Sequence, residues 1–141
     1  MAFTGNFTCD VFKTGLLNGA FDFSSGPFYM ALYTNSATLN ASTTAYTSAG
    51  EASGGTYSAP GQLLANPSVA TSNGVAYITF NNPSWTATPA SPITARGALI
   101  YKAGPNGAIC VLDFGSDKIS TTTFTVQFPV ATNTTAIIRL L

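Results

Sequence analysis

The clearest pattern of apolar and polar positions lies in the second half of the chain. Two apolar runs, residues 98–101 and 108–114, are joined by the segment 102–107, which has the sequence KAGPNG. Gly, Pro and Asn-Gly supply the backbone angles that a tight connection between antiparallel strands requires. The pattern predicts a β-hairpin over residues 98–114.

A third strand is predicted to follow this hairpin. Residues 114–118 (FGSDK) have the composition of a turn. Phe124, Val126 and Phe128 then alternate with polar residues, as in a strand with one buried face. We therefore expect three successive antiparallel strands in this part of the chain.

The N-terminal half contains a helix pattern and a strand pattern. Within residues 10–18, Phe12 and Leu16 are four positions apart and so lie on one helical face, and Gly19 is a typical helix terminator. Residues 28–33 (FYMALY) have the aromatic enrichment of a strand whose two faces are both partly buried.

Short strands and turns account for most of the remainder. Trp85 is expected to anchor the core, and two prolines predict an irregular segment at 88–92. Short strands with one short N-terminal helix indicate an all-β fold, either an antiparallel β-sandwich or a jelly-roll-like barrel of about seven or eight strands. The other predicted elements are a strand at 62–65, a turn at 72–74, a strand at 75–80 and a C-terminal strand at 136–141.

The chain is expected to form one domain over residues 1–141, with residues 1–8 as a candidate N-terminal arm. The arm has no charged side chain and contains Phe3 and Phe7, which must be covered by either their own domain or a neighbouring subunit. Residues 34–60 are rich in Ser, Thr, Ala and Gly, and we interpret them as a long loop that contacts a partner.

The low charge changes the functional interpretation. Only 7% of the residues are charged, five of each sign, whereas a typical soluble domain has about 25%. A net charge near zero favours association between subunits. No basic stripe supports nucleic-acid binding, and no apolar run has the length of a membrane span. The first residues also lack the pattern of a secretion signal, so we expect Cys9 and Cys110 to be reduced thiols.

Little in the sequence suggests catalysis. The chain has no histidine, which removes the commonest general base and the commonest metal ligand. Asp113 and Asp117 are too few for a calcium loop, and we expect Asp113 to meet Arg96 or Lys102 across the hairpin as a brace. We therefore predict neither an enzyme nor a cofactor or metal site. Arg96 could alternatively brace a carboxylate of a partner.

Several segments together resemble a group of small virion structural proteins of tailed bacteriophages. The similarity spans most of the chain in order and is carried by FKTGLLNG (12–19), FYMALYT (28–34), ATLNASTTAY (37–46), ARGALIY (95–101) and VLDFGSDK (111–118). The resemblance implies a component of the particle that has no catalytic residues.

Within that group, the first expectation is a capsid cement or decoration protein. It would be made in the host cytoplasm and bind the outer face of the major capsid protein shell as a homotrimer, stabilising the shell. A tail or fibre-associated virion protein is the alternative inside the particle. Outside the particle, exposed aromatic residues leave a carbohydrate-binding host-recognition module as the second class.

Overall fold

Antiparallel strands make up most of the regular secondary structure in the computed structural model, which describes residues 3–24 and 26–140. The all-β class with one short N-terminal helix is confirmed, and the architecture is sandwich-like. Along the described chain the elements are β1 (Phe7–Thr8), α1 (Asp10–Leu17), β2 (Phe28–Tyr33), β3 (Gln62–Leu63), β4 (Ser68–Ser72), β5 (Val75–Thr79), β6 (Ser84–Thr86), β7 (Ile93–Lys102), β8 (Ala108–Ser120), β9 (Thr123–Thr125) and β10 (Ile138–Leu140).

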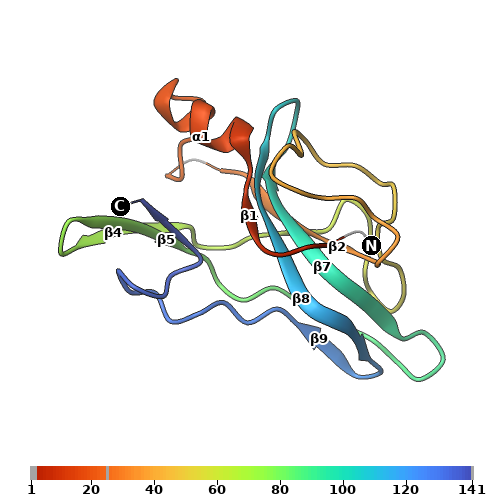
Figure 1. The fold of residues 1–141 in the computed structure, drawn as a ribbon. Coiled ribbons are helices and arrows are strands. Elements are labelled where there is room, and N and C mark those ends of the chain that lie inside the picture. The colour runs from red at the N-terminus through yellow and green to blue at the C-terminus, as the bar shows by residue number, and fades with distance from the viewer. Residues whose placement is uncertain (1–2, 25, 141) are drawn as a thin grey trace.

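The strands form three sheets around one core (Figure 1). The largest sheet has the strand order β1-β8-β7-β2-β3, a second has the order β10-β5-β4, and β6 pairs with β9 in the third. Figure 1 shows the long β7–β8 hairpin through the centre of the molecule and the β4–β5 hairpin projecting to one side. Leu99, Ile100 and Val111 of the central hairpin are fully buried.

The predicted hairpin is confirmed, but the predicted turn at residues 114–118 is wrong. These residues belong to β8, which pairs with β7 on both sides of a large bulge. Ala95 faces Lys118 and Gly97 faces Asp113, so Arg96 alone lies opposite the four residues 114–117. Gly115 has a φ of 83°, a conformation that glycine adopts without steric cost. The residues that resemble a turn therefore form a bulge within a continuous strand.

The predicted buried face after the hairpin is present, but the strand ends at Thr125, earlier than predicted, and has a different neighbour. Phe124, Val126 and Phe128 are buried, and the polar residues between them are exposed. However, β9 pairs with β6 rather than with β8, so that Phe124 lies opposite Trp85. Trp85 is buried, as predicted.

The long segment between β2 and β3 packs closely on the domain. Ala37, Leu39, Ala52 and Tyr57 of this segment are buried, and an isolated bridge joins Tyr33 to Glu51. The segment therefore belongs to the core, although it contains almost no regular structure.

Short strands near both ends of the described chain pair with strands of the sheets. β1 pairs with β8, and β10 pairs with β5, which confirms pairing of the C-terminal strand over its described residues. Residues 1, 2 and 141 of the predicted arm and strand lie outside the described part of the chain.

Candidate functional site

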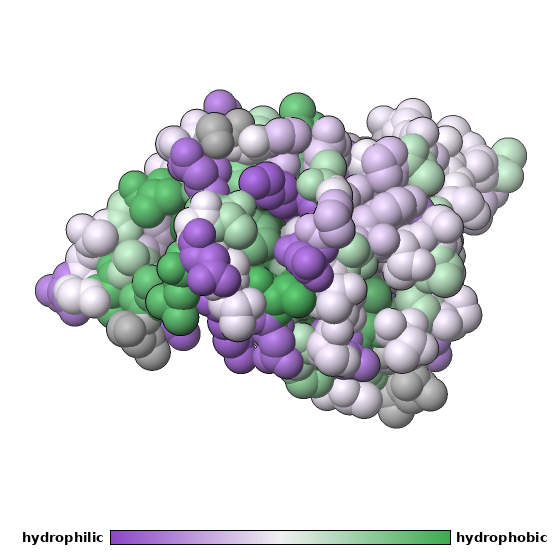
Figure 2. Space-filling view, turned by 90° about the horizontal axis from the view of Figure 1, so that it is seen from above, coloured by the Kyte–Doolittle hydropathy of each residue, from purple (hydrophilic) through white to green (hydrophobic). Residues whose placement is uncertain are grey.

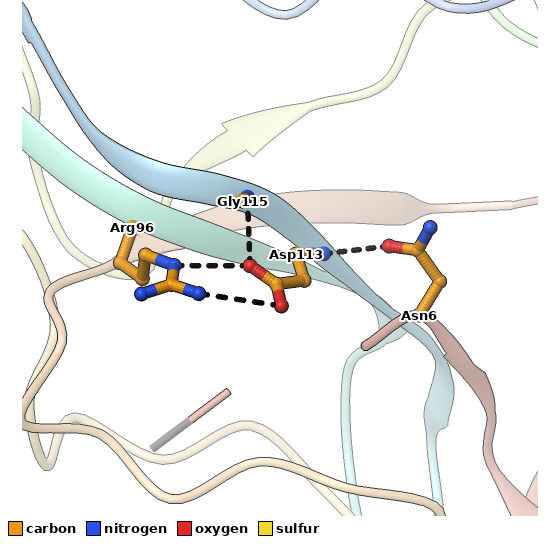
Figure 3. Close-up of polar contacts among 4 residues, drawn as sticks. All are labelled: Asn6, Arg96, Asp113 and Gly115. Atoms are coloured by element: carbon orange, nitrogen blue, oxygen red, sulfur yellow. Dashed lines mark hydrogen bonds and ion pairs between the residues drawn. The ribbon is translucent and has the colours of Figure 1, made fainter. Parts of the chain in front are cut away.

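Arg96 and Asp113 lie on adjacent strands at the bulge and form an ion pair (Figure 3). Arg96 Nε donates to Asp113 Oδ1 at 3.0 Å, and Arg96 Nη2 approaches Oδ2 at 3.5 Å. The N–H of Gly115 donates to the same Oδ1 at 2.8 Å. These contacts, the Gly115 bond first and Arg96 second, lower the pKa of Asp113. Lys102, the other partner considered for Asp113, donates instead to the carbonyl of Ala20.

This polar cluster also secures the N-terminal segment. The backbone N–H of Asp113 donates to Asn6 Oδ1 at 2.7 Å. The Arg96 and Asp113 side chains are only 14% and 12% exposed, and each is committed to contacts inside the domain. The cluster therefore braces β7, β8 and the N-terminal segment against each other.

Of the two alternatives for Phe3, cover by its own domain or by a neighbouring subunit, the structure shows the first. Its ring is fully buried within its own chain, because it packs over Gly97, where the absence of a Cβ leaves room. Phe7 is half-buried and lies opposite Val111 in the β1–β8 ladder. The arm's own domain covers both rings, at least in part.

The two cysteines are brought close to one another by the β1–β8 pairing. Thr8 faces Cys110, and the N–H of Cys9 donates to the carbonyl of Ile109 at 2.9 Å. Both thiols are free and buried. Burial, together with the nearby Asp10 charge, raises the pKa of Cys9 to about 11, and burial raises that of Cys110 further. Such thiols are protonated and unreactive near neutral pH.

Tyrosines gather around Glu51 in the long segment. Tyr46 and Tyr57 each donate a hydroxyl hydrogen bond of 2.5 Å to the Glu51 carboxylate. Tyr101 stacks between Tyr46 and Tyr29, with ring centroids 5.1 and 5.6 Å away. Sequence reasoning assigned Glu51 no role, because its partners are identified only by the folded position of the segment. These two bonds lie within the segment, and the N–H of Leu32 on β2 donates to the Tyr57 hydroxyl at 3.0 Å, which joins the segment to the sheet.

A hollow of about 470 Å³ lies beside these rings. Tyr29, Tyr46 and Tyr101 line it together with Pro60 and the tip of the β7–β8 hairpin. Tyr29 and Tyr46 are half-buried, so part of each remains accessible. The hollow is the place where a sugar could stack on aromatic side chains.

A mainly apolar depression lies between α1 and the three-stranded sheet. We call it the apolar groove. It has a volume of about 600 Å³ and is lined mainly by apolar side chains from α1, the segment 21–24 and the sheet, with Phe12, Leu16, Phe21, Val69, Ile78, Ile138 and Leu140 among them. Figure 2 shows hydrophobic surface over this side of the molecule, bordered by hydrophilic side chains.

Exposed apolar residues gather at the groove. Leu140 and Val69 line it and are 62% and 57% exposed. Large apolar side chains that converge on one accessible depression are typical of protein-binding surfaces. Sequence reasoning missed the groove because β10 and α1 are distant in sequence. The available signal was the apolar C-terminal strand.

The described residues do not supply a constellation for metal chemistry or a membrane-spanning helix. No three His, Cys, Asp or Glu side chains within residues 3–24 and 26–140 lie close enough to share a metal ion. In the same residues, no helix has the length and hydrophobicity that crossing a bilayer requires.

Comparisons with known proteins add no relative. The chain matches no protein-family model, and searches of curated proteins and of solved structures found no similar chain.

Proposed function

We propose that this protein is a non-enzymatic structural subunit of a tailed-bacteriophage particle, which attaches to another virion protein through the apolar groove. The observation that carries the proposal is the exposure of Val69 and Leu140 in the lining of this depression. Burying a leucine side chain contributes about 2 kcal/mol, so a partner that covers the groove gains substantial binding energy.

The sequence resemblance indicates the kind of particle. The resembling segments contribute to α1, β2 and the β7–β8 hairpin, which together form much of the framework. The groove lies on this framework, with α1 as one wall. A rigid β-domain of low charge is well suited to repeated, symmetric contacts within a shell.

Within the particle, we propose a capsid cement or decoration role. The partner is the major capsid protein, and this protein binds the outer face of the shell as a homotrimer. An apolar, uncharged segment of the major capsid protein occupies the groove. Most of the groove lining is apolar, with Lys13, Asp22 and Arg139 also in it, so the interface depends mainly on apolar burial.

A pair of matched variants tests this attachment. Leu140→Asp introduces a charge into the groove, whereas Val130→Asp introduces the same charge at a residue that is 76% exposed and does not line the groove. Added to capsids that lack the protein, Leu140→Asp is expected to bind at least about tenfold more weakly than wild type. Val130→Asp is expected to bind like wild type. Equal binding of both variants would remove the groove from the account.

Two other functions have specific tests. A tail or fibre-associated role places the protein in the tail of the particle instead of on the capsid. Density confined to the tail in a reconstruction of the particle would support this role. A carbohydrate-binding role is favoured by the tyrosine-lined hollow, and a glycan array with the purified protein addresses it. If sugar binding is detected and is lost in Tyr29→Ala, the second class of function replaces the first.

A further inference from the structure

The edge strand β4 leaves backbone groups available for another strand. The β4–β5 hairpin closes through Asn73 and Gly74, which have φ values of 51° and 78°. In such a two-residue turn the flanking pair, Ser72 and Val75, is hydrogen-bonded, and hydrogen-bonded pairs then alternate along an antiparallel ladder. Val69 and Thr71 therefore direct their N–H and C=O groups away from β5.

β4 is also the longest outer strand of the described sheets. It has five residues, whereas the other outer strands, β1, β3, β6, β9 and β10, have two or three. Among the described residues, no backbone hydrogen bond outside the strand ladders involves Val69 or Thr71. Figure 1 shows the β4–β5 hairpin standing away from the β7–β8 hairpin, and four of the five β4 residues are exposed.

Natural proteins usually protect such an edge with charge, proline or a bulge. No charged residue occurs between Glu51 and Arg96, and β4 pairs with β5 without a register shift. Pro67 immediately precedes β4 and lacks an N–H, which limits pairing to the five residues of the strand. The edge is thus short and open to pairing.

We propose that β4 pairs antiparallel with β4 of a second copy of this chain, around a two-fold axis at Ala70. Ala70 then faces Ala70 of the second copy, and Val69 faces Thr71 of that copy. Val69 and Thr71 both direct their backbone groups outward, so the two Val69–Thr71 pairs form four hydrogen bonds. Because β4 contains no charge, no like charges face each other across the axis.

The side-chain pattern supports the same partner. Ile138, Ile78 and Val69 lie side by side across β10, β5 and β4, on the face that lines the apolar groove. Pairing extends this row onto Thr71 and Ala76 of the second copy and covers part of Val69. Two three-stranded sheets become one of six strands with a continuous apolar face. Four backbone bonds and one apolar row form a small interface, so the association is concentration-dependent.

This pairing uses the backbone edge of β4, whereas the proposed attachment to a particle uses the groove, and the two surfaces share Val69. The pairing is compatible with trimers, since a two-fold contact can link two of them. If Leu140→Asp binds capsids like wild type, the groove is removed from the account but the β4 pairing is not. If the pairing tests fail, the role of the groove is unaffected.

Disulfide trapping tests the register. In an unbonded antiparallel pair the two Cα atoms are about 4.5 Å apart, a distance that a disulfide can span. Ala70→Cys is therefore expected to form a covalent dimer under mild oxidation. In Ser68→Cys the two introduced residues would be about 14 Å apart along the paired strands, too far for a bond. The native Cys9 and Cys110 are buried and identical in both variants.

A charge variant provides a second readout without cysteine chemistry. Wild-type protein is expected to sediment at twice the 14.5 kDa chain mass, or a multiple of it, as concentration rises. Ala70→Lys places two like charges opposite each other and is expected to lose the concentration-dependent doubling. Circular dichroism checks that each variant is folded. The proposal is overturned if Ala70→Cys stays uncrosslinked, if Ser68→Cys crosslinks equally fast, or if Ala70→Lys associates like wild type.

Discussion

The ring of Phe3 lies directly over Gly97, so that a Cβ on Gly97 would be 2.8 Å from Phe3 Cδ1. The same Cβ would collide with the carbonyl oxygen of Leu112 on β8. The N-terminal segment and the central hairpin therefore fit together only because residue 97 has no side chain.

Gly97→Ala is expected to lower the free energy of unfolding by about 1 to 3 kcal/mol, the usual effect of overpacking, because the Leu112 carbonyl belongs to the backbone and cannot move freely. Phe3→Ala is expected to lower it by about 3 to 5 kcal/mol. Urea denaturation measures both. The double variant should lose less than the sum, since the collision with Phe3 is then absent. Strict additivity would show that the two residues are not in contact.

Phe124→Ala is expected to cost about 3 to 5 kcal/mol of unfolding free energy, because the ring is buried opposite Trp85. The exposed neighbour Thr125 provides the control, and Thr125→Ala should change stability by less than about 0.5 kcal/mol. Chemical denaturation of the two variants side by side decides the point. A loss below about 1 kcal/mol for Phe124→Ala would mean that the strand face is reversed.

The Asp113 carboxylate is expected to give an acid-dependent contribution to stability. Its pKa is lowered in the folded protein, so the contribution is present above the unfolded value of about 4 and is lost as pH falls through the lower folded pKa. Asp113→Asn should reduce the unfolding free energy by about 1 to 3 kcal/mol at pH 7. The difference from wild type should shrink toward pH 3 in urea titrations. A difference that is constant with pH would contradict the ionic brace.

Tyr46 is expected to contribute to the free energy of unfolding with the opposite pH dependence, because its contribution is lost at high pH. Burial first, and then the hydrogen bond to Glu51, raise its pKa to about 12, compared with about 10 in the unfolded chain. Its contribution is therefore complete below about pH 10 and is lost as pH rises toward 12. Tyr46→Phe removes this contribution, so its stability should fall less steeply over that range than that of wild type. Parallel curves would exclude Tyr46 as a source of the dependence.

Local patterns were sufficient for the elements whose contacts are local. The β7–β8 hairpin and the Asn73–Gly74 turn were predictable because the connecting residues determine the backbone path. α1 was predictable because its apolar spacing and Gly19 act within a few residues. The Arg96–Asp113 brace followed from the same hairpin.

Other features depend on contacts between distant segments. The FGSDK segment has turn chemistry, but β7 holds it in a bulged strand, and the pairing of β9 with β6 has no local signal. The long segment is held on the sheet by contacts such as the hydrogen bond from the Leu32 N–H on β2 to the hydroxyl of Tyr57, which is 25 residues away in sequence. The apolar groove likewise exists only after β10 has paired with β5 beside α1.

The most direct test of the proposed function is a cryo-EM reconstruction of the phage particle that contains this protein. The proposal predicts copies distributed over the outer face of the capsid, each with the apolar groove between α1 and the three-stranded sheet against the major capsid protein. Density confined to the tail, or a groove that faces solvent in every copy, would contradict it.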